Sequence, residues 1–183
     1  MKTHTLAIPA ILFGLLSATA CLAQGTQAAS TSAANSLASP DKEFVQAASM
    51  SSSTEIDAAK LAEKQSKDKD VKSFARHMAT DHTKLTVQLK MAAPHGVTIP
   101  KDNSDIAVLD SLKGLTGPEF DKSYIQQVGL DGHKKAVAAF QTEADGGNDA
   151  SLKKAAQKAL PTIKEHLQMA QDLAKKKGVP SGQ

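Results

Sequence analysis

The sequence of 183 residues has a single cysteine, no tryptophan and only 3% aromatic residues. One cysteine excludes an internal disulfide and a CxxC redox motif. So few aromatic side chains cannot build the stacking platforms on which single-stranded nucleic acids bind. Lysine and arginine (22) nearly balance aspartate and glutamate (19), and the two signs are mixed along the chain. We therefore expect no nucleic-acid partner.

Long apolar runs are missing beyond the N-terminus. The first residues combine Lys2, an apolar run over 6–16 and small side chains beyond it. This pattern is typical of a secretory signal peptide, because a membrane-spanning helix needs about 20 apolar residues. We predict a signal peptide over 1–23, a periplasmic or envelope location and no transmembrane span. Cleavage before Cys21 would instead leave a lipid anchor, which we favour less because Ala18 stands where lipoproteins prefer leucine.

The rest of the chain divides by composition. Residues 24–40 are rich in alanine, serine and threonine, contain one large apolar side chain, and predict a disordered tether. Residues 41–177 carry the apolar periodicity of helices and predict one domain. Gly178 and Pro180 stop the last helix, so we expect 178–183 to be a flexible tail.

Four long helical patterns fill the predicted domain, at residues 41–67, 70–93, 118–145 and 149–177. The first two and the last two are separated by short turns, which favours two antiparallel hairpins. The connection over 94–117 is long and contains a lesser helical pattern at about 104–113. One long crossover between two hairpins predicts an all-α protein, an antiparallel four-helix bundle of ferritin-like arrangement.

Each long helix places one polar residue on its apolar face. These residues are Glu55, His82, His133 and His166, whereas His77 projects outward. All four lie near the middle of their helices, and the midpoints of antiparallel helices meet. The sequence therefore predicts that one glutamate and three histidines converge in the core.

Such a cluster has two interpretations. Three imidazoles and a carboxylate suit one transition-metal ion (zinc, copper or iron), whose binding would weaken as the pH falls near 6.5. Alternatively, the four groups satisfy one another as a polar core that fixes the helix register. No inward Glu-x-x-His spacing supports a di-iron oxidase. We also find no arrangement of catalytic residues, so an enzyme is the least favoured class and no catalytic or organic-cofactor residue is predicted.

Four motifs, in this order, resemble those of an uncharacterised bacterial family with domain of unknown function 4142, in the ferritin-like superfamily. Its members are commonly described as membrane or predicted outer-membrane proteins. The resemblance covers about residues 41–176 and implies a ferritin-like fold, an envelope location and signature positions at the three histidines. The motifs comprise Phe74, Ala75, Met78, Asp81, His82 and Thr83; Phe120, Asp121 and Tyr124; Asp131, His133, Ala136, Val137 and Phe140; and Leu160, Pro161, His166 and Leu167.

The resemblance supplies no activity, so two functions stay open. The first is an exported helical bundle that binds a metal ion for metal handling or envelope stress. The second is a non-catalytic structural or interaction module with a self-satisfied Glu/His core. The substrate, the protein partner and the oligomeric state are not indicated by the sequence.

Overall fold

The computed structural model describes residues 37–181. The predicted signal peptide, Cys21 and most of the predicted tether lie outside these residues. Between residues 37 and 181 the chain is helical and has no strand, which confirms the all-α class. Its elements are α1 (Ser39–Gln65), α2 (Lys69–Ala92), α3 (Ile106–Lys113), α4 (Gly117–Tyr124), the π-helix η2 (Ile125–Gly132), α5 (His133–Gly146) and α6 (Ala150–Lys177).

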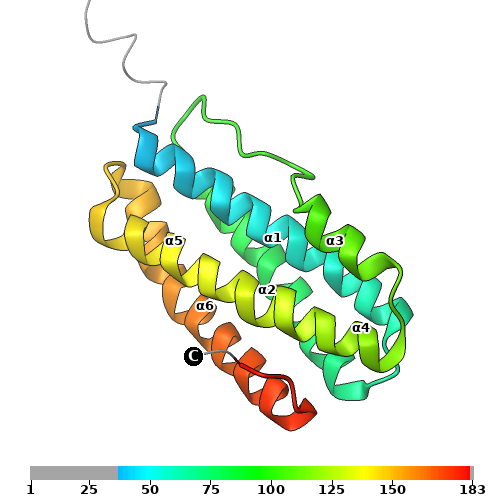
Figure 1. The fold of residues 1–183 in the computed structure, drawn as a ribbon. Helices are drawn as coiled ribbons and strands as arrows, with labels where there is room; N and C mark the ends of the chain where they lie inside the picture. Colours follow the sequence, from blue (N-terminus) through cyan, green and yellow to red (C-terminus); the bar gives the residue numbers. More distant parts are fainter. Residues whose placement is uncertain (1–36, 182–183) are drawn as a thin grey trace, which may run out of the picture. The chain divides into compact units, whose positions relative to one another are not determined.

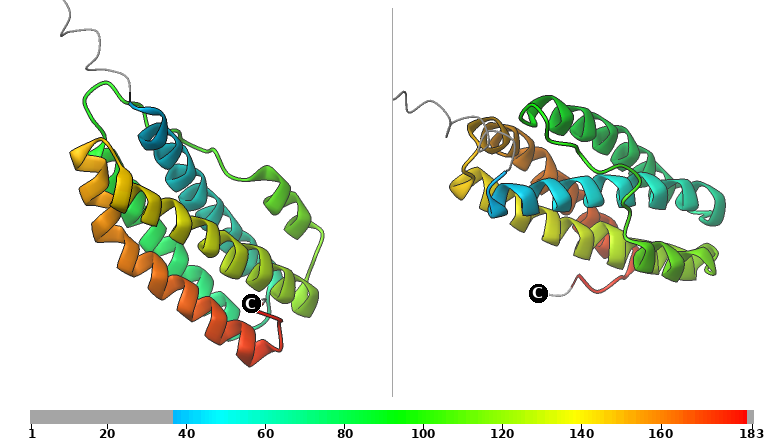
Figure 2. Two further views of the ribbon diagram at one scale, coloured as in Figure 1. Left: turned by 60° about the vertical axis from the view of Figure 1, so that its left-hand side comes forward. Right: turned by 90° about the horizontal axis from the view of Figure 1, so that it is seen from above.

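Helices α4, η2 and α5 follow one another without a break and form the third long helical segment (Figure 1). Four long segments therefore lie side by side, and α3 covers one side of α1 (Figures 1 and 2). The most extensive packing joins α1 to α2 and α5 to α6. Smaller contacts join α2 to α6 and α1 to α5.

Short turns and side-chain caps set the ends of these helices. Asp68 precedes α2 and accepts hydrogen bonds from the backbone N–H groups of Asp70 and Val71. Asp149 caps α6 in the same way, through Ser151 and Leu152. These carboxylates satisfy donors that the first helical turn leaves without partners. An aspartate at the preceding turn thus begins both α2 and α6.

Two boundaries differ from the sequence prediction. Helix α1 begins at Ser39, so the last residues of the predicted tether are helical. At the other end, Gly178 adopts a left-handed conformation and Val179 is buried, with its N–H donating to Ala174 O. This pair of residues forms a Schellman motif, whose hydrophobic contact fixes the chain just after the helix. The predicted flexible tail therefore does not begin at residue 178.

The interior contains two apolar clusters. We call the first the Phe120 cluster; it gathers the C-terminal half of α1, the start of α2, α3, α4, η2 and the end of α6. The second, the Phe140 cluster, gathers the start of α1, the end of α2, α5 and the first half of α6. Between them lies a polar layer, the histidine layer, which consists of Glu55, His82, His133 and His166.

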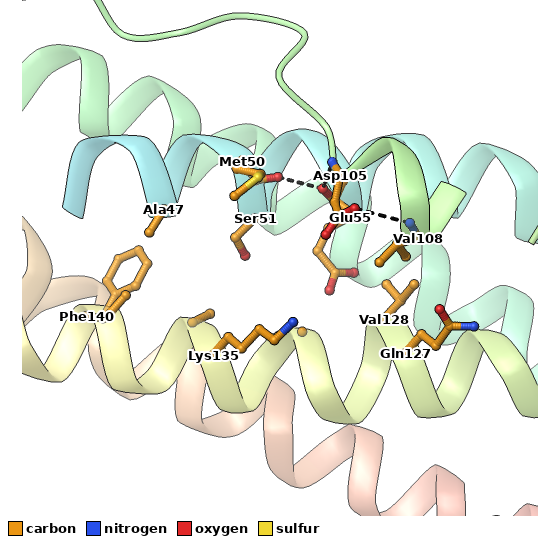
Figure 3. Close-up of a pocket in the computed structure, with 14 residues that line it drawn as sticks. Ala47, Met50, Ser51, Glu55, Asp105, Val108, Gln127, Val128, Lys135 and Phe140 are labelled. Atoms are coloured by element: carbon orange, nitrogen blue, oxygen red, sulfur yellow. Dashed lines mark hydrogen bonds between the residues drawn. The ribbon is translucent and has the colours of Figure 1, made fainter. Parts of the chain in front are cut away.

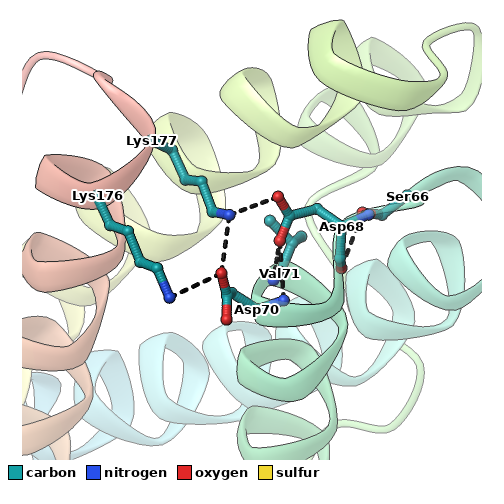
Figure 4. A network of polar contacts seen from close by, with 6 residues as sticks. All are labelled: Ser66, Asp68, Asp70, Val71, Lys176 and Lys177. Carbon is teal, nitrogen blue, oxygen red and sulfur yellow. Dashed lines mark hydrogen bonds and ion pairs between the residues drawn. The ribbon is translucent and has the colours of Figure 1, made fainter.

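Lysines at the end of α6 meet the start of α2 beside the Phe120 cluster. Lys177 donates to the carboxylates of Asp68 and Asp70, and Lys176 also reaches Asp70 (Figure 4). The Asp68 carboxylate holds the first turn of α2 at the same time. These ion pairs are partly exposed, so they join the two helix ends without burying charge.

Candidate metal centre

The three predicted histidines meet in the core. His82 comes from α2, His133 from the first position of α5 and His166 from α6, and each is only 1% exposed. One ring nitrogen of each lies within 4.8 Å of one ring nitrogen of the other two. The ring centroids are 5.4 to 5.6 Å apart. Three imidazoles at these distances are close enough to share one ion after small side-chain movements, because a zinc–nitrogen bond is about 2.0–2.1 Å.

One nitrogen of each ring contacts a polar group of the protein. His82 Nδ1 is 3.3 Å from Ser52 Oγ, and His133 Nδ1 donates to the carbonyl oxygen of Gly129 at 2.9 Å. His166 Nε2 is 3.2 Å from Asp81 Oδ2. Metal-binding histidines are commonly oriented in this way, by a hydroxyl, carbonyl or carboxylate on the nitrogen that does not bind the metal. These contacts fix the ring orientations.

The other nitrogen of each ring has no partner. His82 Nε2, His133 Nε2 and His166 Nδ1 are all buried without a hydrogen bond. A buried polar atom left unpaired costs about 1–3 kcal/mol, and nearly all such atoms in folded proteins are paired. Three of them in one layer are therefore an unusual concentration of unsatisfied lone pairs. A metal ion would satisfy all three together.

Burial also keeps the imidazoles neutral. It lowers the pKa of His133 to about 4, with a further contribution from His166. Burial likewise holds the pKa of His82 well below its ordinary value, and it lowers that of His166 despite the opposing carboxylate of Asp81. Neutral imidazole is the form that binds a metal. The three side chains are thus in the ligand form at neutral pH.

Glu55 occupies a different position from the one expected. Its Oε1 atom is 3.4 Å from His133 Nδ1, the nitrogen that faces Gly129, and its Oε2 atom is buried without a partner. Among residues 37–181, the groups of convergent metal-ligating atoms do not include Glu55. Burial raises the pKa of this carboxyl well above its usual range. Glu55 therefore lies behind one histidine rather than beside all three.

A cavity of about 220 Å³ opens on the Glu55 side of the layer, between α1, α3 and the third helical segment. Glu55 and Lys135 both point into it, and Phe140 and Met50 supply apolar walls (Figure 3). Glu55 lines this cavity, although it is only 2% exposed. None of the three histidines is among the residues that line the cavity.

The π-helix η2 positions His133 and was not anticipated from the sequence. At the end of this π-helix the His133 N–H donates to Leu130 O, three residues earlier, instead of to Gly129 O, its partner in a regular α-helix. Gly129 O thereby accepts from the His133 side chain. π-Helical stretches inside α-helices are rare and frequently occur at functional sites. Gly129 and Gly132 were the available signal, since glycine lowers helical preference and lets neighbours approach closely.

Gly129 also lets α6 approach. A Cβ atom at this position would lie 3.3 Å from Ala170 Cβ, which is tighter than ordinary packing. The small residues at this crossing bring the two helices that carry His133 and His166 together. The π-helix and the close helix crossing therefore both help to position the imidazoles of His133 and His166.

The described chain is thus an all-helical protein with a buried group of three neutral histidines. The sequence matches the family described as Domain of unknown function (DUF4142) over residues 26–173, and the chain belongs to that family. This confirms the family resemblance of the sequence motifs. Among curated proteins, none matches the sequence significantly.

Two solved structures share the fold. One is a DUF305 protein from Streptomyces coelicolor, described as a candidate secreted protein, with a TM-score of 0.64 and 15% identity; the alignment covers 79% of this chain and 96% of that one. The other is a DUF305 fragment from Deinococcus radiodurans, with a TM-score of 0.61 and 16% identity, over 76% and 98% of the two chains. At these identities the likeness shows the fold alone.

No helix within residues 37–181 combines the length and apolar character needed to cross a membrane.

Proposed function

We propose that this protein is an exported four-helix bundle of the ferritin-like type that binds one transition-metal ion through His82, His133 and His166. The observation that carries the proposal is the set of three unpartnered, buried ring nitrogens, one from each of three helices. The bundle assignment is supported by the packing of α1 on α2 and of α5 on α6. Export is supported by the signal-like residues 1–23 and by the secreted description of one structural neighbour.

The ligand set narrows the choice of ion. Three neutral imidazoles in a buried site suit zinc, copper or iron rather than calcium or magnesium, which prefer oxygen. Three protein ligands leave a fourth position open to water or to another small ligand. Glu55, which we first expected to bind the ion, lies 3.4 Å from His133 Nδ1, the ring nitrogen that faces Gly129. The protein would then serve metal handling or the response of the envelope to metal stress.

The alternative, a polar core without metal, requires the four groups to satisfy one another. The three inward nitrogens and Glu55 Oε2 have no hydrogen-bond partner, so the arrangement lacks the internal pairing that this alternative needs. We therefore place metal binding first. A metal-free core becomes the correct interpretation if the experiments below find no binding.

The test is metal content and binding in protein purified without a polyhistidine tag. Elemental analysis of the purified protein and calorimetric titration with Zn²⁺, Cu²⁺ and Fe²⁺ should give one ion per chain. His82→Ala, His133→Ala and His166→Ala should each abolish tight binding. His95→Ala removes an exposed loop histidine and serves as the matched control, with wild-type binding expected. Wild-type protein that binds none of the three metals would refute the proposal.

The thermal stability gives an independent readout. An ion held only by the folded state stabilises it by mass action, by about 2.7 kcal/mol at a concentration roughly a hundredfold above Kd. Metal should therefore raise the Tm of the wild type and of His95→Ala much more than that of His82→Ala. Because burial lowers the pKa of the ligands, protons should begin to compete with the metal at a lower pH than the sequence alone suggested.

A further inference from the structure

A second group of possible ligands lies on the outer side of His166. His77 and Asp81 are four residues apart on α2 and therefore share a face of that helix. Asp81 Oδ2 is 3.2 Å from His77 Nε2 and also 3.2 Å from His166 Nε2. The three ligand atoms of this group lie within 4.8 Å of one another. Two imidazoles and a carboxylate at this spacing form a ligand set for the same metals as the inner group.

The two groups share His166. The side chain of His77 is 48% exposed, that of Asp81 19% and that of His166 only 1%. The other nitrogen of His166, Nδ1, is buried without a partner. The ligands thus run from solvent to the core, and the ring of His166 stands at the boundary between the two groups.

The chemistry of imidazole prevents both groups from using His166 at once. A neutral imidazole has one nitrogen with a free lone pair and one that carries a proton. An ion on Nε2 requires the proton on Nδ1, whereas an ion on Nδ1 requires the proton on Nε2, where Asp81 can accept it. The two positions are therefore alternatives for one ion, and passage from one to the other needs only a proton exchange on the ring and no redox change.

We propose that His77, Asp81 and His166 form an outer metal site, at which a transition-metal ion first binds and from which it passes to the inner histidines. This inference rests on the proposed function for its destination, the inner group. Asp81 is suited to both stages. Its Oδ1 atom is held by Lys84 Nζ at 2.9 Å, so Oδ2 stays directed at the two imidazoles. When the ion is at the outer site, Oδ2 binds it. When the ion is at the inner site, Oδ2 accepts a hydrogen bond from His166 Nε2–H.

Loading kinetics test the passage. Stopped-flow absorption with Co²⁺ as the probe should show that His77→Ala loads about tenfold more slowly than the wild type, the lower end of what local attraction adds to association rates. The equilibrium affinity of the inner histidines for Co²⁺ should stay unchanged, since these ligands are intact. Dissociation of the ion should therefore slow by the same factor as loading. His95→Ala is the matched control and should load like the wild type. Equal loading rates of His77→Ala and wild type would overturn the passage while leaving the inner centre untouched.

Equilibrium binding tests the outer site itself. His133→Ala removes an inner ligand but keeps His77, Asp81 and His166. This variant should bind one Co²⁺ more weakly than the wild type, and the His77→Ala/His133→Ala double variant should bind none. Equal binding by the single and double variants would overturn the outer site. The inner centre would be overturned instead if His133→Ala bound Co²⁺ at full strength and His77→Ala did not bind it. Far-ultraviolet circular dichroism of each variant checks that the fold is retained.

Discussion

The apolar clusters and the histidine layer are buried to the same degree, yet they act on stability in opposite directions. Phe120 and Leu152, one from each cluster, are fully buried, and burial of such a side chain contributes about 1.5–3 kcal/mol. His82 and His133 are 1% exposed, but each keeps one nitrogen without a partner. Burial in the clusters is expected to stabilise the fold, whereas each unpartnered nitrogen of the histidine layer is expected to cost about 1–3 kcal/mol. Folding alone therefore does not explain why the layer is there.

The same alternation occurs on every long helical segment. On α2, His82 stands between Met78 of the Phe120 cluster and Leu85 of the Phe140 cluster. On α6, His166 stands between Ala170 of the first and Ile163 of the second. The polar residues thus share one height in the domain. A layer confined in this way can be altered without changing either cluster, which makes the comparison testable.

The largest expected effect is in an apolar cluster. Phe120 is fully buried and stacks on Tyr124, with ring centroids 5.7 Å apart. Phe120→Ala should lower the free energy of unfolding by about 3–5 kcal/mol, because it removes buried apolar surface and leaves a cavity. Urea denaturation measures this. Ile106→Ala is the control: Ile106 is 60% exposed, so its truncation should change stability by less than about 0.5 kcal/mol.

The histidine layer should respond in the opposite way. His82→Leu replaces a ring with an unpartnered nitrogen by an apolar side chain. In the absence of metal, the variant should be as stable as the wild type or up to about 2 kcal/mol more stable, because one unpaired buried atom is removed. In excess Zn²⁺ the order should reverse. A metal-free His82→Leu destabilised as strongly as Phe120→Ala would show that the layer supports the fold and would weaken the comparison.

The sequence predicted much of this layout, for a physical reason. Helical periodicity depends on burial of one face, so the apolar stripes located the long helices to within two residues at each end. The same projection brought His82, His133 and His166 together, as the structure places them. That a metal binds there stays a prediction.

What the sequence could not predict depends on local geometry. Projection at a regular 100° per residue assumes an unbroken α-helix, and the π-turn η2 breaks that assumption just before His133. Periodicity also places a residue on a face without fixing which atom it contacts, so Glu55 was expected among the ligands although it meets Nδ1 of His133. The proximity of His77 to Asp81 and His166 was missed for the same reason, because an exposed histidine only becomes a candidate ligand once its neighbours are known.

A second buried polar site sharpens the comparison, because its charge can be set by pH. Glu143 lies at the end of α5 beside Asp41, and burial, with the Asp41 carboxylate, raises its pKa from 4.5 to about 7. The folded protein keeps this proton where the unfolded chain has lost it, so stability should fall as the pH rises from about 4.5 to about 7. Glu143→Gln cannot ionise and should become increasingly more stable than the wild type over this range.

Urea midpoints measured near pH 5 and near pH 8 test this expectation. Glu165→Gln, an exposed position on α6, is the matched control and should give the same difference from the wild type at both pH values. If the Glu143→Gln advantage does not grow with pH, the ionised carboxylate is tolerated at this position, and burial of a polar group by itself would not be destabilising in this protein.

The smallest effect is expected where polar groups stay in water. Lys177 bridges the carboxylates of Asp68 and Asp70, which lowers the pKa of Asp68, but the lysine side chain is 21% exposed and the aspartates are similarly accessible (Figure 4). Solvent screens such pairs, and holding long side chains in place costs entropy. Lys177→Ala should therefore lower the Tm only slightly. Lys177 is a better position to change than Asp68, because replacing Asp68 would also remove the cap of α2.

Salt provides the decisive control for this pair. The Debye length falls from about 10 Å at 0.1 M salt to about 3 Å at 1 M, so the difference between wild type and Lys177→Ala should shrink as salt is added. A double-mutant cycle with Asp70→Asn isolates the pairwise contribution. A coupling that persists undiminished in high salt would mean that the contact is desolvated. The ion pairs at the ends of α2 and α6 would then be shielded from water, as the histidine layer is. The two regions would differ in whether their polar groups are paired, and not in their access to water.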